Sequence, residues 1–210
     1  LFDSLCEPLC AMGLSWLYFA FVAITVIALC FIGSVFAAKS MLYEAKDNEL
    51  LLSMPVPPSY IMASRMVVLM LLNYIYAAFV VIPAVIIYFM NEPISVVKIL
   101  FIIIVFLVLS LIALALSCLI GWLIAIITSR LRNTNIITMV LSVAFLGVYF
   151  YVYSRMQTYV AKLIANGEAI GEAVKKTVFP IYHMGLAIAE ENVVSLLVFV
   201  ACAVLPFVIA

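Results

Sequence analysis

Few residues of this sequence have the types and spacing needed for catalysis or metal binding. Cys6 and Cys10 are four residues apart, so on a helix they would share a face where two thiolates could hold a metal ion, but no histidine accompanies them. The single histidine, His183, lies in a polar region, and we interpret it as structural. There is no HExxH motif and no pair of aspartates inside an apolar segment. The sequence therefore predicts neither a catalytic site nor a metal site, and we do not expect the chain to be an enzyme.

The chain that would position the cysteines and the histidine consists mostly of apolar residues. Of the 210 residues, 70% are hydrophobic and 10% are charged, whereas globular domains average roughly 45–50% and about 25%. The charged residues leave five charge-free runs, each longer than the roughly 18 residues that mark a membrane-spanning helix. The composition excludes a water-soluble domain and predicts an all-α polytopic membrane protein with a single transmembrane domain. We expect five transmembrane helices at residues 12–38, 66–90, 99–128, 135–153 and 192–210.

The charge balance limits the possible binding partners, and the first residues indicate how the chain begins. Ten basic and ten acidic side chains give a net charge of zero, so there is no electrostatic basis for binding nucleic acid or for a polybasic lipid anchor. The chain opens Leu1-Phe2-Asp3 without a methionine or a basic leader. We therefore expect a fragment that lacks its native start and at least one earlier helix.

Two connections between the predicted helices are long and charged. Residues 39–65 carry six charges and contain a short leucine-rich stretch that ends at a proline, which predicts a short interfacial helix. Residues 155–191 carry eight charges, and their periodicity predicts two short amphipathic helices at 155–165 and 168–178. The first could dock a soluble partner and the second could form an outer helix pair, although either could simply lie on the lipid surface.

Because antiparallel spans alternate sides, these two connections fall on opposite sides of the membrane. Basic residues are denser in the connections 39–65 and 130–132 than on the other side. The positive-inside rule then places residues 39–65 in the cytoplasm and residues 155–191 outside.

The predicted spans contain no ionisable side chain, whereas proton-coupled machines usually place such groups in the membrane. Asn73 and Pro83 in the second span could hydrogen-bond and bend a translocation path, although kinked helices are common without transport. Ala113, Ser117 and Gly121 are spaced by four in the third span, and this small-residue stripe predicts the close approach of another helix. Four functions are compatible with these spans. They are a transporter whose energy comes from a group outside the membrane, an ion-coupled carrier, a channel subunit and a scaffold that does not transport.

The segment from Ala45 to Pro58, with Ile61, Ser64 and Arg65 after it, resembles the first cytoplasmic loop of ABC exporter permeases of the second exporter type. The resemblance implies that this loop forms a coupling helix that docks in a cleft of the ATP-binding subunit, with Arg65 anchoring the loop. The docking residues that it implies are Glu44, Asp47, Glu49, Leu50, Leu51, Leu52 and Met54.

The same resemblance implies the rest of the assembly. The five spans would be helices two to six of a six-helix permease, with a pair of extracellular re-entrant helices before the last span. The permease would work with a second permease copy or a homologous permease, and with separate ATPase subunits that bind ATP and Mg, in a bacterial cytoplasmic membrane. The chain itself has no Walker motif, so we expect no cofactor in it.

Overall fold

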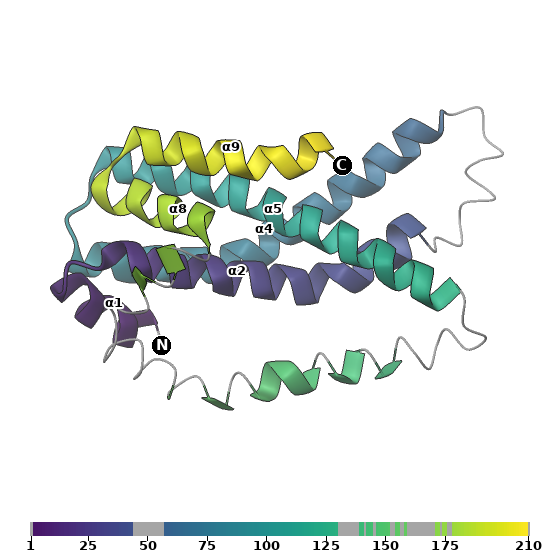
Figure 1. Ribbon diagram of the computed structural model, residues 1–210, viewed down its shortest axis with the longest axis horizontal. Helices are drawn as coiled ribbons and strands as arrows, with labels where there is room; N and C mark the ends of the chain where they lie inside the picture. Colours follow the sequence, from purple (N-terminus) through teal and green to yellow (C-terminus); the bar gives the residue numbers. More distant parts are fainter. Residues whose placement is uncertain are drawn as a thin grey trace.

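The computed structural model describes residues 2–43, 57–129 and 178–209 continuously, together with residues 139, 140, 142–144, 146–151, 154, 155, 158, 171, 172, 174 and 175. Every regular element in these parts of the chain is a helix, which confirms the prediction of an all-α fold for them. The elements, coloured along the sequence in Figure 1, are α1 (Phe2–Ala11), α2 (Ser15–Ala38) with its π-helical continuation η1 (Lys39–Tyr43), α4 (Pro58–Asn91), α5 (Val96–Ser129), α8 (Phe179–Glu190) and α9 (Val193–Ile209).

Within the described parts of the chain, three helices are long and apolar enough to cross a membrane, namely Ser15–Leu42, Pro58–Asn91 and Val96–Ile126. They coincide with the first three predicted spans. Val193–Val204 in α9 and the segment Ser142–Tyr151 are shorter apolar helices. The 34 residues of α4 extend about 51 Å at 1.5 Å per residue, well beyond a hydrocarbon core of roughly 30 Å. The chain is therefore a helical integral membrane protein whose long helices tilt in the bilayer or project from it.

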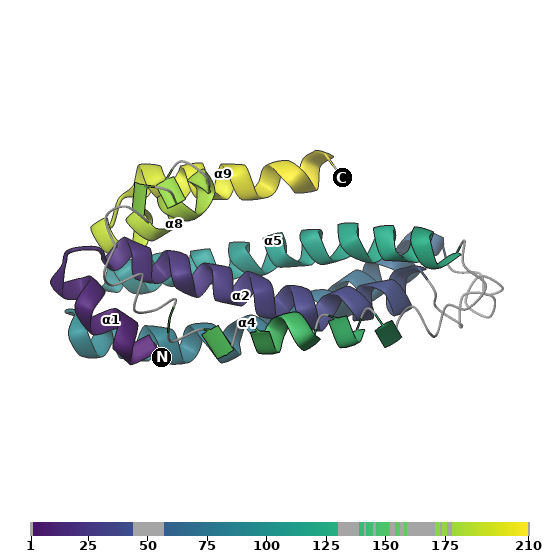
Figure 2. The ribbon, with the colours of Figure 1, turned by 60° about the horizontal axis from the view of Figure 1, so that its bottom comes forward.

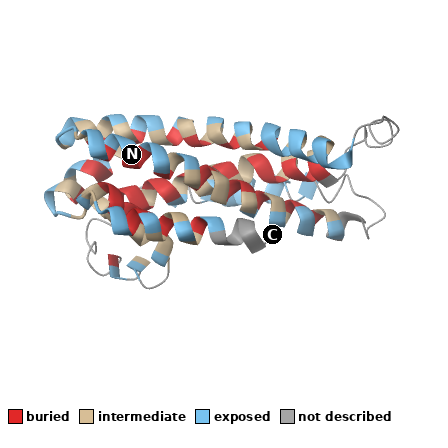
Figure 3. Cartoon of the chain, turned by 90° about the horizontal axis from the view of Figure 1, so that it is seen from above, coloured by how far each residue is buried: buried red, intermediate tan, exposed pale blue. Residues whose placement is uncertain are grey.

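Helix α2 lies at the centre of the bundle, in contact with α1, α4, α5 and α8. Figure 2 shows α8 and α9 on one side of α2 and α4 on the other. The outer face of α4 is apolar and exposed, and Figure 3 shows such exposed faces around a buried interior. Because the solvent of this bundle is lipid, an exposed apolar stripe on an outer helix needs no further explanation. The stripe contains Leu71, Ile75, Phe79, Ile82, Ile86 and Met90.

Contacts along α2 fix the directions of its neighbours. Tyr18 of α2 donates a hydrogen bond to Ala84 of α4, and Cys30, further along α2, donates one to Asn73, earlier in α4. The residue numbers of α4 therefore decrease as those of α2 increase, so the two helices are antiparallel. Ser34 of α2 bonds to Ser117 of α5, and Ala38 lies beside Gly121, so these two helices are parallel. The bundle thus has a loop end, formed by residues 39–43, 57–65 and 121–129, and a turn end, formed by residues 11–15, 91–96 and 190–193.

Prolines begin two of the helices. Pro58 is at the first turn of α4 and Pro180 is at the first turn of α8, where the missing N–H is not needed and the fixed φ of proline suits a helix. The sequence did not predict α8, because the amphipathic periodicity of the preceding segment ends at residue 178 and the next predicted element is the last span. α8 instead forms a hairpin with α9, and the side chain of Asn192 accepts hydrogen bonds from the backbone N–H groups of Val194 and Ser195 at the start of α9.

Candidate functional site

Arg65 joins two long helices at the loop end of the bundle. Its Nη1 donates a hydrogen bond of 2.9 Å to the carbonyl oxygen of Met41 in η1. In a π-helical turn the backbone bonds run to the fifth residue rather than the fourth, and such turns occur frequently at functional sites. The bond ties the start of α4 to the end of α2, which are consecutive elements joined through residues 44–56. The seven docking residues that the resemblance implies all fall within residues 44–56, outside the described residues.

The small-residue stripe of α5 faces α2. Ala113, Ser117 and Gly121 are all buried. A Cβ atom added to Gly121 would lie 3.3 Å from the Cβ of Ala38 and 3.3 Å from the backbone nitrogen of Lys39, so the two backbones approach closely here. The Oγ of Ser34 donates to the Oγ of Ser117 at 2.5 Å.

Helix α2 carries a matching stripe of small residues that the sequence pattern did not predict. Cys30, Ser34 and Ala38 are also spaced by four and fully buried. Because α2 and α5 are parallel, each of these residues is offset by 83 positions from its counterpart on α5, as the Ser34 to Ser117 bond shows. The repeated spacing of small residues in α2 could have predicted this stripe. The spacing is hard to recognise because most of the surrounding residues are apolar as well.

Asn73 lies on the buried face of α4. Its Nδ2 donates to the carbonyl oxygen of Leu69 at 3.0 Å, and its own carbonyl oxygen accepts from the Sγ of Cys30 at 3.5 Å. The side-chain oxygen of Asn73 is buried without a hydrogen-bond partner among the described residues. Pro83 is on the exposed side of the same helix. The structure therefore does not bring the two candidate path residues together.

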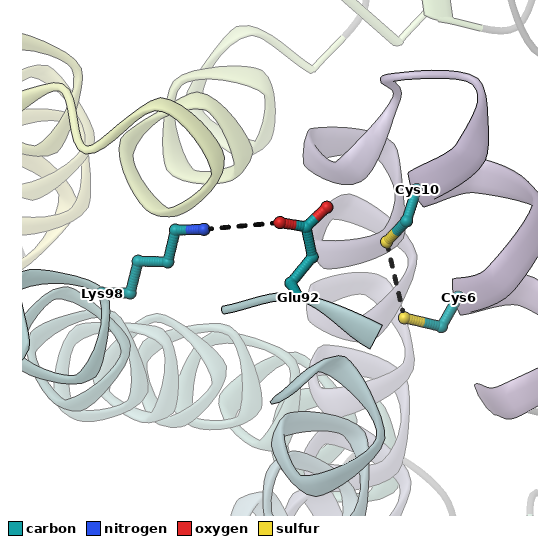
Figure 4. Close-up of polar contacts among 4 residues, drawn as sticks. All are labelled: Cys6, Cys10, Glu92 and Lys98. Carbon is teal, nitrogen blue, oxygen red and sulfur yellow. Dashed lines mark hydrogen bonds and ion pairs between the residues drawn. The ribbon is translucent and has the colours of Figure 1, made fainter. Parts of the chain in front are cut away.

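The turn end holds a second polar cluster, shown in part in Figure 4. Lys98 at the start of α5 is only 8% exposed, its Nζ lies 3.8 Å from Oε2 of Glu92, and it sits 5.5 Å from the centre of the Tyr88 ring. A buried ammonium group requires such a partner, because an unpaired charge away from water is costly. The hydroxyl of Tyr18 donates to the carbonyl oxygen of Ala84 at 2.8 Å, which fixes α2 against α4 near this end.

His183 packs between elements rather than in a catalytic group. Its Nδ1 is 3.4 Å from Oγ of Ser195, and its ring meets that of Phe179 edge to face. The contact with Ser195 joins α8 to α9, whereas Phe179 and His183 both lie on α8. Within the described ranges, no group of three or more His, Cys, Asp or Glu side chains could hold a metal ion.

An apolar hollow separates α2 from the segment Ser142–Tyr151. Its volume is about 340 Å³, near the lower limit of small-molecule sites, which span roughly 300–1,000 Å³. Its lining is mostly apolar, with Ser142 and Tyr149 as the residues that carry hydroxyl groups. Its lining residues are Leu29, Ile32, Phe36, Ser142, Leu146 and Tyr149.

These arrangements join helices and bury polar groups. Comparison of the chain with protein-family models, with curated proteins and with solved structures finds no match.

Proposed function

We propose that this chain is the transmembrane permease subunit of an ABC exporter of the second exporter type, driven by an ATPase on a separate subunit. The observation that carries the proposal is the Arg65 to Met41 hydrogen bond, which pins together the two helix ends joined by the segment resembling a coupling loop. Because both ends of this loop are held, a displacement of the loop moves the attached helices α2 and α4 instead of bending the loop.

The packing of α2 supports a route for that push. α2 contacts α4 through the Tyr18 and Cys30 bonds, and α5 through the Ser34 bond and the close approach at Gly121. When ATP closes the pair of ATPase subunits, the coupling helix at residues 47–54 moves, and α2 and α4 tilt together. The path between two permease copies then changes its accessibility from one side of the membrane to the other.

The chain directions support the five-span topology of this proposal. α5 ends at the loop end, whereas α8 packs against the first turns of α2 at the turn end, with the rings of Trp16 and Tyr182 5.0 Å apart. Residues 130–177 therefore connect the two ends, and a fourth crossing at residues 135–153 with α9 as the fifth meets this requirement. The loop end is then cytoplasmic, and α8 is a re-entrant helix on the outer side of a bacterial cytoplasmic membrane.

The experiment that tests the proposal is copurification of the full-length protein with an ATP-binding subunit from detergent. Leu51→Asp puts a charge on the apolar side of the coupling helix and should release that subunit. Ile94→Asp is the matched control, because it makes the same change of charge at a residue that is 70% exposed at the turn end. Release by Leu51→Asp alone supports the proposal, whereas equal retention in both variants, with transport intact, overturns the coupling assignment.

An ion-coupled carrier is the second candidate, and one observation favours it. The buried side-chain oxygen of Asn73 has no hydrogen-bond partner among the residues that the structure describes, and carbonyl oxygens can coordinate a cation inside a membrane bundle. Transport that persists after loss of the ATPase, and that depends on Na⁺ and on Asn73, would select this function over an ABC permease.

A further inference from the structure

The short helix α1 places two thiol groups side by side at the turn end. The Sγ atoms of Cys6 and Cys10 are 3.6 Å apart, as Figure 4 shows. Both cysteines are free thiols. Cys6 is fully buried, while Cys10 is half-buried, so one side of the pair remains open to the outside of the bundle. α1 packs against α4 and α2, which holds the pair in a fixed place.

The helical spacing disfavours a disulfide between these residues. Side chains four residues apart on a helix have Cβ atoms about 5–6 Å apart, whereas a disulfide needs Cβ atoms about 3.5–4.5 Å apart. Direct oxidation would therefore have to distort α1. A metal ion between the sulfur atoms removes this conflict, because it adds two metal–sulfur bonds to the bridge.

The distance between the sulfur atoms fits such an ion. Two metal–thiolate bonds of about 2.3 Å that span a 3.6 Å separation enclose an angle of roughly 100°, close to the tetrahedral angle and far from a linear arrangement. Structural zinc requires four protein ligands, and no set of three His, Cys, Asp or Glu ligands exists in the described parts of the chain. Soft thiolate ligands bind monovalent copper as well as zinc, and the shortage of protein ligands for a four-coordinate zinc site favours copper here.

We propose that Cys6 and Cys10 form a binding site for Cu(I) at the turn end of the bundle. Each thiol releases its proton to solvent as its sulfur forms a bond to copper, and no electron is transferred. The exposed carboxylates of Asp3 and Glu7 on the same helix favour a cation over an anion at this place. A third ligand from solution can complete the coordination on the open side, at Cys10.

The test is a competition for Cu(I) between the full-length protein in detergent and bathocuproine disulfonate, in the absence of oxygen. We expect the unmodified protein to take one Cu(I) per chain, Cys10→Ser to take none, and Cys202→Ser to behave as the unmodified protein. Cys202 is the matched control because it is also a half-buried free cysteine, on α9. Equal uptake by Cys10→Ser and the unmodified protein, or uptake by neither, overturns the site.

A second measurement does not depend on how the variants fold. Cu(I) added to the unmodified protein should protect Cys10 from alkylation by N-ethylmaleimide, as read by peptide mass spectrometry. Alkylation at the same rate with and without copper contradicts the proposal. A Cys6–Cys10 disulfide that forms in air with the helix intact would also contradict it, because it would show that the two sulfurs meet without a metal.

Discussion

Replacement of Gly185 by alanine should destabilise the protein, although the same change usually stabilises a helix. Gly185 lies in α8, where its backbone crosses the first turn of α2. A Cβ atom at this position would overlap the carbonyl oxygen of Trp16 and lie 3.0 Å from its carbonyl carbon and 3.2 Å from its Cα. These are backbone atoms, so they cannot rotate away as the end of a side chain would. α8 must therefore move away from α2.

The magnitude follows from two opposing terms. Alanine in place of glycine within a helix contributes about 0.5–1 kcal/mol in favour of the folded state. Overpacking a close contact costs typically about 1–3 kcal/mol, and a gap of 0.5–1 Å loses about a quarter to a half of each dispersion contact around it. Met184, Ala187 and Ile188 are the buried side chains of α8 that would lose contacts. We expect a net loss of about 1–2 kcal/mol, or several degrees in Tm for a chain of this length.

The assay is thermal unfolding in detergent, followed by the fluorescence of Trp16 in a Trp122→Phe background. The control is Gly147→Ala, because Gly147 is helical and a Cβ atom there would meet nothing within 4 Å. That variant should be as stable as the parent or slightly more stable. If Gly185→Ala matches Gly147→Ala, the close crossing of α8 and α2 is refuted.

Three further predictions concern single polar contacts. Ser34→Ala and Ser117→Ala should each cost roughly 0.5–1 kcal/mol, and the double variant should cost less than their sum, because both remove one hydrogen bond; additive losses in thermal unfolding would contradict this. Tyr18→Phe should cost about 1 kcal/mol through loss of the bond to the carbonyl oxygen of Ala84, and an unchanged Tm would show that the bond contributes nothing. Burial raises the pKa of the Cys6 thiol from 9.0 to about 12, with further contributions from the Cys10 thiol. The unfolded chain therefore loses this proton near pH 9 while the folded chain keeps it, so Cys6 should lower stability as pH rises from about 9 to 12. Cys6→Ala should flatten that fall in a pH series of unfolding curves, and an unchanged slope would contradict the raised pKa.

The long helices were predictable because membrane insertion depends on composition over about 20 residues, which a single sequence displays directly. Each charge-free run of residues 8–38, 66–91 and 99–129 contains most of one long helix. The helices extend past the runs, since backbone hydrogen bonding continues through residues such as Arg65 that leave the hydrocarbon core. Helix α1 was not predicted, because it carries the charges of Asp3 and Glu7 and the charge-free run begins only at its residue 8. Residues 12–14, with Gly13 at a φ of 71°, separate α1 from α2.

The partners of the helices could not be predicted in this way. The stripe at Ala113, Ser117 and Gly121 shows that some helix approaches α5, but nothing local identifies α2 as that helix or sets their parallel register. Asn73 and Pro83 are ten residues apart, which is enough to put them on different sides of α4. Lys98 is buried through a contact with Glu92 across a turn, so its burial depends on how α4 and α5 meet. The docking residues at 44–54 fall outside the described residues and stay a prediction.

The central claim is that residues 47–54 dock on an ATP-binding subunit, and site-directed cross-linking tests it most directly. Leu51→Cys and Ile94→Cys are placed one at a time in a background without the five native cysteines, and native membranes are treated with a short thiol-to-amine cross-linker. The account predicts an adduct between position 51 and an ATP-binding protein, identified by mass spectrometry, and no such adduct from position 94. Absence of the adduct at position 51 in membranes that retain transport would contradict it.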